Sequence, residues 1–420
     1  MNVEVVTIGD ELLLGFTIDT NAVHLARELA AVGVDIVRRT TVGDDADAIA
    51  DAVRAALERT GAVITTGGLG PTADDMTKPA IASLFGRAMR LDEPTLARHK
   101  AMWARRFPTR SFPEPNVAQS MVPEGAELLE NNHGSAPGIW LEDQRGRWVA
   151  MLPGVPREMR GMLKDVLLPR IVARVVAEGH GASVVRSRTL RTTGIAESAL
   201  AERLGDAARQ VEGMNVASLP GVDGTDLRIT ARDMDAHAAD RALDAGVGRL
   251  RERAGHFVYG EGDVDLAALV LDACRARGLH IGVGESCTGG MLGARLTAVP
   301  GSSDVVLGGV IAYHDDVKRD LLDVPGDLLR AHGAVSEPVA RAMAAGARAR
   351  TGAEVGVGIT GIAGPGGGSE AKPVGTVWIA VDIEGEQRAL HSVFWGNREE
   401  VRYRAAQAAL DVIRRMLSGL

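Results

Sequence analysis

The chain has 420 residues, of which 45% are hydrophobic and 24% are charged, and its formal net charge at pH 7 is -8. These values are ordinary for a globular protein, and this length predicts two or three domains. The net charge offers no general attraction to nucleic acid, and we expect neither a membrane-spanning segment nor a signal peptide from the apolar runs. We therefore expect a cytoplasmic protein with no membrane partner and no strong nucleic-acid signal.

The first segment alternates strand-like and helix-like runs. Hydrophobic periodicity predicts strands at 3–8, 35–42 and 61–66, and helices at 21–32 and 46–58. This alternation is typical of an open parallel sheet with helices on both faces, in which ligands bind at the carboxyl ends of the strands.

Two of these strand ends, at 9–15 and 66–78, carry residues suited to phosphate and metal chemistry. Glycines in the second loop expose backbone N–H groups that can hold a phosphate, and nearby carboxylates suit a divalent cation. The candidate phosphate-binding residues are Gly67, Gly68 and Gly70. The candidate metal ligands are Glu11, Asp74 and Asp75. An aspartate at the start of a helix is also a common cap, so a structural alternative remains open for one of the two aspartates.

The next segment has a different order of elements. Its pattern predicts strands at 184–191, 214–219 and 227–230, and helices at 196–210 and 236–253, which together indicate a small α+β domain. Gly221 and Gly224 superficially match the glycine pair that clamps an RNA backbone. They fall between two strands and enclose Asp223, so we favour a hairpin turn. Residues 259–263 are expected to form the linker to the last domain.

The last domain returns to alternating helices and strands from about Val264. Its first helix carries Cys274 on an apolar face, where we expect a core residue, and the two cysteines of the chain suggest neither a disulfide framework nor a zinc site.

The run Ile281 to Gly290 then resembles a strand that enters a helix, with Ser286 at the junction. Backbone N–H groups at such a junction can stabilise an oxyanion, and Ser286 can act as a nucleophile there. The alternative is that Ser286 only caps the following helix.

A serine nucleophile needs a base, and the histidines of this domain form no clear triad pattern. Residues 305–313 read as a strand that ends in Tyr313, and Lys318 follows with Asp315 and Asp316 as expected helix caps. A buried lysine can accept the serine proton, and a tyrosine hydroxyl can orient or relay it. The alternative is an aromatic side chain at the end of a strand and a solvated lysine.

A second glycine-rich stretch, at 358–375, is long enough to fold over a substrate in the same cleft. Strands are expected at 376–382 and 389–394, and the closing helix begins at Asn397, which places Arg398 in its first turn, within reach of a phosphate. The candidate substrate-binding residues of this domain are Thr288, Gly289, Gly290, Thr360, Gly361 and Arg398.

Several motifs in combination resemble the CinA family of competence- and damage-inducible proteins. In the first segment these are 66–77, Asn132-His-Gly-Ser-Ala-Pro-Gly138 and Leu152-Pro-Gly-Val-Pro-Arg-Glu-Met159. In the last segment they are Glu285-Ser-Cys-Thr-Gly-Gly290, Tyr313 with Lys318, and the glycine-rich stretch. The resemblance implies an α/β chain with three domains. These are a molybdopterin-binding-like open sheet with helices on both faces (1–170), a small α+β KH-like domain (171–258) and an α/β nicotinamide mononucleotide deamidase domain (259–420).

The resemblance also implies two chemistries that act on small-molecule nucleotides. The first domain of the family is associated with ADP-ribose hydrolysis, for which we expect a divalent metal (Mg, Mn or Co). The family's Ser, Tyr and Lys positions fall on Ser286, Tyr313 and Lys318, which would deamidate nicotinamide mononucleotide without a cofactor. Two rivals stay open, namely molybdenum cofactor synthesis for the first domain and a non-enzymatic role in competence or DNA repair for the whole chain. We expect a homodimer.

Overall fold

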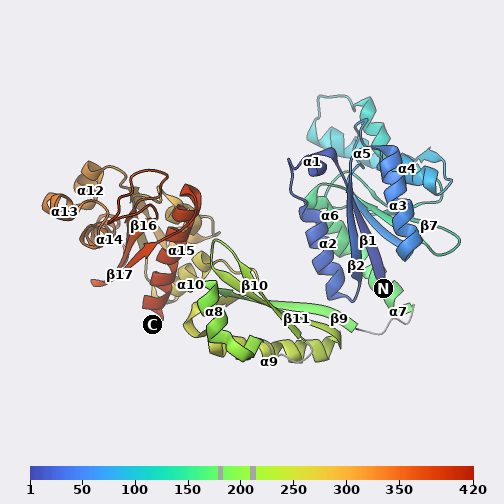
Figure 1. The fold of residues 1–420 in the computed structure, drawn as a ribbon. Helices are drawn as coiled ribbons and strands as arrows, with labels where there is room; N and C mark the ends of the chain where they lie inside the picture. The colour runs from blue at the N-terminus through green and yellow to red at the C-terminus, as the bar shows by residue number, and fades with distance from the viewer. Residues whose placement is uncertain (178–182, 209–213) are drawn as a thin grey trace. The chain divides into compact units, whose positions relative to one another are not determined.

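The computed structural model describes residues 1–177, 183–208 and 214–420, and Figure 1 shows its helices and strands. The chain divides into two compact units. One comprises Met1–Arg186 with Ala231–Asp240, and the other comprises Ser187–Thr230 with Arg241–Leu420.

The N-terminal domain is built on a six-stranded sheet in the order β2-β1-β3-β8-β7-β6. Its strands are β1 (Asn2–Ile8), β2 (Asp35–Val42), β3 (Ala62–Thr66), β6 (Glu127–Leu129), β7 (Gly138–Glu142) and β8 (Trp148–Leu152). The neighbouring strands β2, β1, β3 and β8 are parallel to one another, as the sequence predicts. β7 and β6, where the sequence predicted no strands, are antiparallel to their neighbours. A separate antiparallel ribbon pairs β4 (Met89–Leu91) with β5 (Met121–Pro123).

Helices cover both faces of this sheet, and each face has its own core. The helical segments are α1 (Asp10–Leu13), α2 (Thr20–Ala31), α3 (Ala46–Thr60), α4 (Thr77–Leu84), α5 (Glu93–Arg106), η1 (Glu114–Ser120), α6 (Pro156–Met162), η2 (Leu163–Leu167) and α7 (Leu168–Ala177). One core joins α2, α6 and α7 to the sheet, and the other joins α3 and α4. Alternation along the strands explains this division, since Val5 faces the first core and Val6 the second.

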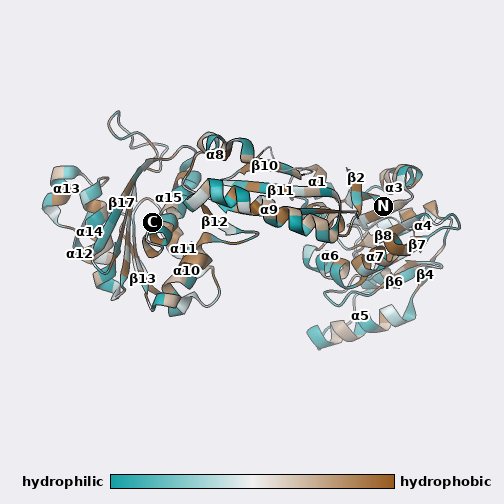
Figure 2. Ribbon diagram, turned by 90° about the horizontal axis from the view of Figure 1, so that it is seen from below, coloured by the Kyte–Doolittle hydropathy of each residue, from teal (hydrophilic) through white to brown (hydrophobic). Residues whose placement is uncertain are grey.

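The middle domain is a four-stranded sheet in the order β10-β11-β9-β12 with helices beside it. Its elements are β9 (Ser183–Thr192), α8 (Glu197–Leu204), η3 (Gly205–Ala208), β10 (Met214–Pro220), β11 (Thr225–Asp235), α9 (Ala236–Ala254), η4 (Gly255–Phe257) and β12 (Val258–Glu261). The predicted helix at 196–210 ends early because Gly205 adopts a positive φ of 51°, and residues 209 and 210 lie outside the described part of the chain. Figure 2 shows both hydrophilic and hydrophobic residues along α9, as expected of a helix with one packed face.

Two details of the middle domain bear on the sequence predictions. The amide of Gly221 donates to the carbonyl of Gly224 at 2.7 Å between the neighbouring strands β10 and β11. The hairpin interpretation is therefore confirmed, and this glycine pair does not lie between two helices as an RNA clamp does. The expected linker at 259–263 is partly wrong, because β12 pairs antiparallel with β9.

The C-terminal domain contains a five-stranded sheet in the order β14-β13-β15-β16-β17. The strands are β13 (Ile281–Glu285), β14 (Val306–Ile311), β15 (Val355–Gly361), β16 (Thr376–Ile383) and β17 (Glu386–Val393). β14, β13 and β15 are parallel, whereas β16 and β17 are antiparallel. The helical segments are α10 (Leu266–Arg277), α11 (Met291–Thr297), η5 (Ser302–Asp304), α12 (Asp315–Leu322), α13 (Gly326–His332), α14 (Glu337–Thr351) and α15 (Arg398–Leu417).

Alternating glycines and valines in β13 and β15 determine how this sheet is covered. The valines face a core with α10, α11 and α15, where Cys274 is fully buried as predicted. The glycines face α14. A Cβ added to Gly356 would lie 2.1 Å from the Ala344 carbonyl oxygen, and one added to Gly358 would lie 2.2 Å from that of Ala340. Only glycine therefore lets α14 pack this closely against the strands that carry the candidate site.

Candidate active sites

The loop after β13 is organised by a buried carboxylate, Glu285, which closes the strand. Its Oε2 accepts hydrogen bonds from the amides of Gly290 (3.0 Å) and Leu292 (3.1 Å), and its Oε1 accepts one from Gly293 (2.8 Å). These are N–H groups at the start of α11 that have no intrahelical partner. Glu285 therefore caps the start of α11. The alternative in which Ser286 caps this helix is wrong. The short loop 286–290 separates the strand from the helix.

The hydrogen bonds of Glu285 determine which backbone amides of the loop can bind a substrate. The amide of Gly290 is used by Glu285, and that of Gly289 donates to the Ser286 carbonyl at 3.1 Å. Among the described residues, no oxygen accepts from the amides of Cys287 and Thr288, although both amides interact with the Cys287 sulfur. The amides of Gly289 and Gly290 are thus engaged within the loop, and the two preceding amides are the candidates to stabilise an oxyanion.

One pocket of about 280 Å³ brings together most of the predicted residues of this domain. Its predicted lining residues are Ser286, Tyr313, Lys318, Thr360, Gly361 and Arg398. Cys287, Asp315 and the glycine-rich segment 361–367 complete much of the wall. Thr288, Gly289 and Gly290 do not line it. The Ser286 hydroxyl forms no hydrogen bond with any described residue, which leaves it available to a ligand.

Lys318 is almost fully buried, with 1% of its surface exposed, although its chemistry is that of a charged group. Its Nζ donates to the Tyr313 carbonyl at 3.2 Å and to the Asp315 carboxylate at 3.1 Å. An ammonium has three hydrogens, so one position on Nζ remains for the pocket that Lys318 lines. The alternative of a solvated lysine is therefore wrong. The expected caps are also wrong, because the His314 side chain accepts from the Asp316 amide and caps α12.

Tyr313 and Arg398 meet at the rim of this pocket. The strand ends at Ile311, two residues earlier than predicted, so Tyr313 lies in the following loop and is 59% exposed. Its hydroxyl oxygen lies 2.7 Å from Nη2 of Arg398, whose Nη1 donates to the Gly364 carbonyl at 2.7 Å. This pair places a cation beside the glycine-rich segment, where an anionic substrate group can be bound.

Cys287 is adjacent to Ser286 in the sequence and, like Ser286, is buried and lines the pocket. It is 5% exposed and belongs to the core beneath the sheet. Burial raises the pKa of the Cys287 thiol to about 12. The thiolate is the nucleophilic form of cysteine, so this side chain is inert at neutral pH.

Arg402 holds the other end of the loop and was not predicted from the sequence. Its Nε and Nη2 both donate to the Thr288 carbonyl, at 3.0 Å and 2.7 Å. Arg402 and Thr288 are 114 positions apart in the chain, so no local pattern could have revealed the contact. Its position one turn after Arg398 on α15 is the only sequence signal.

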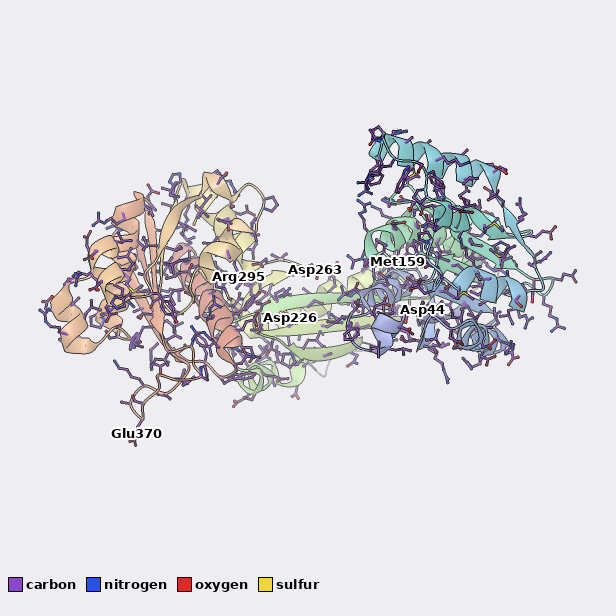
Figure 3. All side chains as sticks on the ribbon, turned by 90° about the horizontal axis from the view of Figure 1, so that it is seen from above. Asp44, Met159, Asp226, Asp263, Arg295 and Glu370 are labelled. Carbon is purple, nitrogen blue, oxygen red and sulfur yellow. The ribbon has the colours of Figure 1, made fainter. Side chains whose placement is uncertain are left out.

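The glycine-rich stretch leaves β15 and returns at β16. Lys372 anchors it by donating to the carbonyls of His332 (3.1 Å) and Val335 (2.7 Å). Figure 3 shows Glu370 at the tip of this loop, away from the body of the domain.

The predicted phosphate loop in the N-terminal domain follows β3. Gly67 and Gly68 have φ values of 112° and 65°, which favour glycine. Asp75 ties the loop together, because its carboxylate accepts from the amides of Gly70 (2.7 Å) and Thr72 (2.8 Å) and from the Thr72 hydroxyl (2.5 Å). Asp75 therefore has a structural role in the loop, and a hydrogen bond with the Thr72 side chain lowers the pKa of Asp74. Asp75 does not cap α4, whose N-cap is Met76.

The other predicted carboxylates lie within a wider acidic group. Burial raises the pKa of Asp44, and the negative charges of Asp10, Glu11 and Asp74 add to this rise, while the Asp10 amide that donates to Asp44 opposes it. A cation would relieve this repulsion. Within the described ranges, however, no three His, Cys, Asp or Glu side chains are arranged to hold a metal. Mg²⁺ commonly uses one or two carboxylates together with substrate phosphates, so Glu11 and Asp74 fit such an ion, whereas Asp75 is already occupied.

Among the helices of residues 1–177, 183–208 and 214–420, none has the length and apolar character needed to cross a bilayer.

Comparisons with known proteins cover the whole chain. Family models match at 4–173 (probable molybdopterin binding domain), 187–260 (damage-inducible protein CinA KH domain) and 263–417 (CinA C-terminal domain). A CinA-like protein of Gemmatimonas aurantiaca is 64% identical over 415 residues, which are 99% of this chain and 96% of that protein. Another, from Salinibacter ruber, is 43% identical over 419 residues and is covered completely. A solved CinA superfamily protein from Klebsiella pneumoniae is 35% identical with a TM-score of 0.36, and the match covers 37% of this chain and 97% of that one.

Proposed function

The chain belongs to the CinA family, and from that premise we propose that its C-terminal domain hydrolyses nicotinamide mononucleotide to nicotinic acid mononucleotide and ammonia. The observation that carries the proposal is the pocket that unites Ser286, Tyr313, Lys318 and Arg398. It supplies a nucleophile, a basic group and an anion-binding cation within one cavity. A cytoplasmic location, where the nucleotides are found, is part of this proposal.

In the proposed reaction the Ser286 hydroxyl oxygen attacks the carboxamide carbon, and Lys318 in its neutral form accepts the hydroxyl proton. The amides of Cys287 and Thr288 stabilise the negative charge that develops on the carbonyl oxygen. The proton then passes to the leaving nitrogen, which departs as ammonia and leaves an acyl ester on Ser286. Water hydrolyses this ester and restores the serine. Arg398 binds the phosphate of the substrate, and Tyr313 orients the proton path.

Measurement of both products tests the proposal directly. Purified full-length chain should release ammonia and nicotinic acid mononucleotide in equal amounts from nicotinamide mononucleotide. The rival from another class is a non-enzymatic partner protein of competence or DNA repair. Failure to release either product, in protein whose folding is verified by circular dichroism, would favour that rival.

A second candidate function belongs to the N-terminal domain, for which we propose hydrolysis of ADP-ribose to AMP and ribose 5-phosphate. The supporting observation is a loop with two positive-φ glycines beside Glu11 and Asp74. A bound divalent cation would neutralise phosphate charge and supply an activated water. Asp75 holds the loop amides so that the remaining backbone N–H groups can face a pyrophosphate. Cleavage assays with added Mg, Mn or Co test this function and identify the preferred metal.

We further propose that the chain forms a homodimer. Four apolar side chains that precede α2, namely Leu13, Leu14, Phe16 and Ile18, are between 56% and 84% exposed. Exposed apolar patches of this kind often form contacts between subunits. Light scattering after gel filtration measures the mass directly, and Phe16→Asp should reduce it if this patch is the contact.

A further inference from the structure

A second pocket of about 410 Å³ lies within the compact unit that contains the middle and C-terminal domains. Residues 193–196 and 222–224 of the middle domain form one side, and β17 and α15 form the other. It shares no lining residue with the Ser286 pocket. Its volume is in the range of small-molecule sites, so we asked what chemistry its walls would recognise.

The walls combine apolar surface with charge. Ile195, Leu390, Phe394 and Val412 supply apolar side chains that suit the body of an organic ligand. Both aspartates of the lining are already paired. The Asp223 carboxylate lies 3.2 Å from Arg191, and the two oxygens of Asp411 bind Arg414 (2.7 Å) and Arg415 (2.8 Å). Oδ1 of Asp223 is nevertheless buried without a hydrogen-bond partner among the described residues, so this aspartate leaves one acceptor available to a ligand donor.

Arg404 and Arg415 both line this pocket with a buried Nε that has no hydrogen-bond partner in the described chain, but Arg415 is also paired with Asp411 through Nη2. The Arg404 guanidinium lies 4.1 Å from the centre of the Trp395 ring, a cation–π contact that leaves its N–H groups free. No described carboxylate forms an ion pair with this side chain. A buried charged donor without an acceptor is costly, and two of the three unsatisfied atoms in this lining are guanidinium donors, so the pocket favours a ligand that brings an anionic acceptor.

We propose that this pocket is a second ligand site, which binds an organic anion that joins one carboxylate or phosphate group to an apolar or aromatic body. The anionic group accepts from Arg404, and the body packs on Phe394 and Leu390. Because the walls come from two domains, the ligand also stabilises the contact between them. Among the described residues, polar bonds across that contact include those from Gln407 to Thr193 (3.4 Å) and from Arg414 Nη2 to the His256 carbonyl (2.7 Å).

Isothermal titration calorimetry of the full-length chain tests this site with AMP and benzoate as probes of phosphate and carboxylate. Adenosine serves as the uncharged counterpart of AMP, and inorganic phosphate as the anion without a body. We expect at least one probe to bind with a component that Arg404→Gln weakens at least tenfold, and adenosine and phosphate to lack that component. The probe that binds identifies the anionic group.

Two further variants make the result decisive. Ala408→Leu fills the pocket from α15 without removing a charge, and should also abolish the component. Arg249→Gln, at an exposed position on α9, and Ser286→Ala should both retain it, which separates this site from the deamidase pocket. The proposal is wrong if neither probe binds, or if the binding is unchanged in both Arg404→Gln and Ala408→Leu. It is independent of the proposed deamidase activity, because the readout is binding.

Discussion

Lys318 has the burial of a core residue and the hydrogen-bond partners of a charged one. Arginine at this position would keep the positive charge but could not release a proton at working pH. We therefore expect Lys318→Arg to lose deamidase activity almost as completely as Lys318→Ala, by at least about 10²-fold in kcat. Tyr313→Phe should have a milder effect, because its hydroxyl lies at the exposed rim and contacts Arg398. Steady-state ammonia release measures all three, and substantial activity in Lys318→Arg would exclude the lysine as base.

Lys78 is a second buried lysine, in the N-terminal domain, and it gives a prediction about pH. Burial lowers the pKa of Lys78 to about 8, although the charge of Asp75 opposes the shift, and its Nζ donates to the Ala118 carbonyl at 2.8 Å. The unfolded chain keeps this proton up to about pH 10.5, so between these pH values the folded state binds fewer protons. Stability should therefore rise from pH 8 to pH 10.5, by at most about 3 kcal/mol from this group.

The measurement compares variants, since other groups titrate in the same window. Urea unfolding followed by tryptophan fluorescence should show a smaller rise in Lys78→Met than in the wild type. Lys100→Met, at an exposed position on α5, should keep the wild-type rise. Equal pH dependence in all three chains would contradict the assignment.

At the scale of elements, the junction between β13 and α11 depends on Glu285. Glutamine at this position has one acceptor oxygen in place of two, so at least one of the three amides loses its partner. We expect Glu285→Gln to lower the free energy of unfolding by about 1–3 kcal/mol and to reduce deamidation, because the same loop positions Ser286. Glu370→Gln, at the exposed tip of the glycine-rich loop, is the matched control. Urea titrations that gave the two variants the same stability would show that Glu285 is not a structural cap.

Regular elements were predictable because their signals are local. The strands β1, β2 and β3 and the helices α2 and α3 follow the hydrophobic periodicity to within about two residues. The antiparallel β6 and β7 were missed, since strand direction depends on pairing across the sheet and leaves little trace in a short apolar run. β12 was missed because this strand contains Gly260 and is followed by Gly262, and glycines so close together are typical of a turn.

The candidate site was predictable as a set of residues and not as a geometry. Ser286, Tyr313, Lys318, Thr360 and Arg398 line one pocket, as a shared cleft requires. The sequence did not predict which loop amides are engaged, because the role of Glu285 depends on how the chain turns after the strand. The role of Arg402 could not be predicted from the sequence either, since its contact with Thr288 forms only when α15 packs beside that loop.

For the molecule as a whole, we predict two independent chemistries. A chelator should stop the cleavage of ADP-ribose and leave deamidation intact, because the Ser286 site takes its nucleophile and base from side chains. Asp75→Ala should have the same effect as the chelator, because it releases the loop amides. Ser286→Ala should stop deamidation and leave the cleavage of ADP-ribose intact. Both activities are assayed on the same preparation. If one substitution removed both activities while circular dichroism remained native, the two sites would have to be coupled.

The central claim, that Ser286 is the nucleophile of an amide hydrolase, is tested most directly by comparing two adjacent residues. Cys287 is the intrinsically better nucleophile, but burial raises the pKa of its thiol to about 12. Ammonia release from nicotinamide mononucleotide should therefore fall by at least about 10³-fold in Ser286→Ala and stay near the wild-type rate in Cys287→Ala. The claim would be contradicted if folded Ser286→Ala kept a substantial rate, or if Cys287→Ala and a thiol-alkylating reagent each silenced the enzyme.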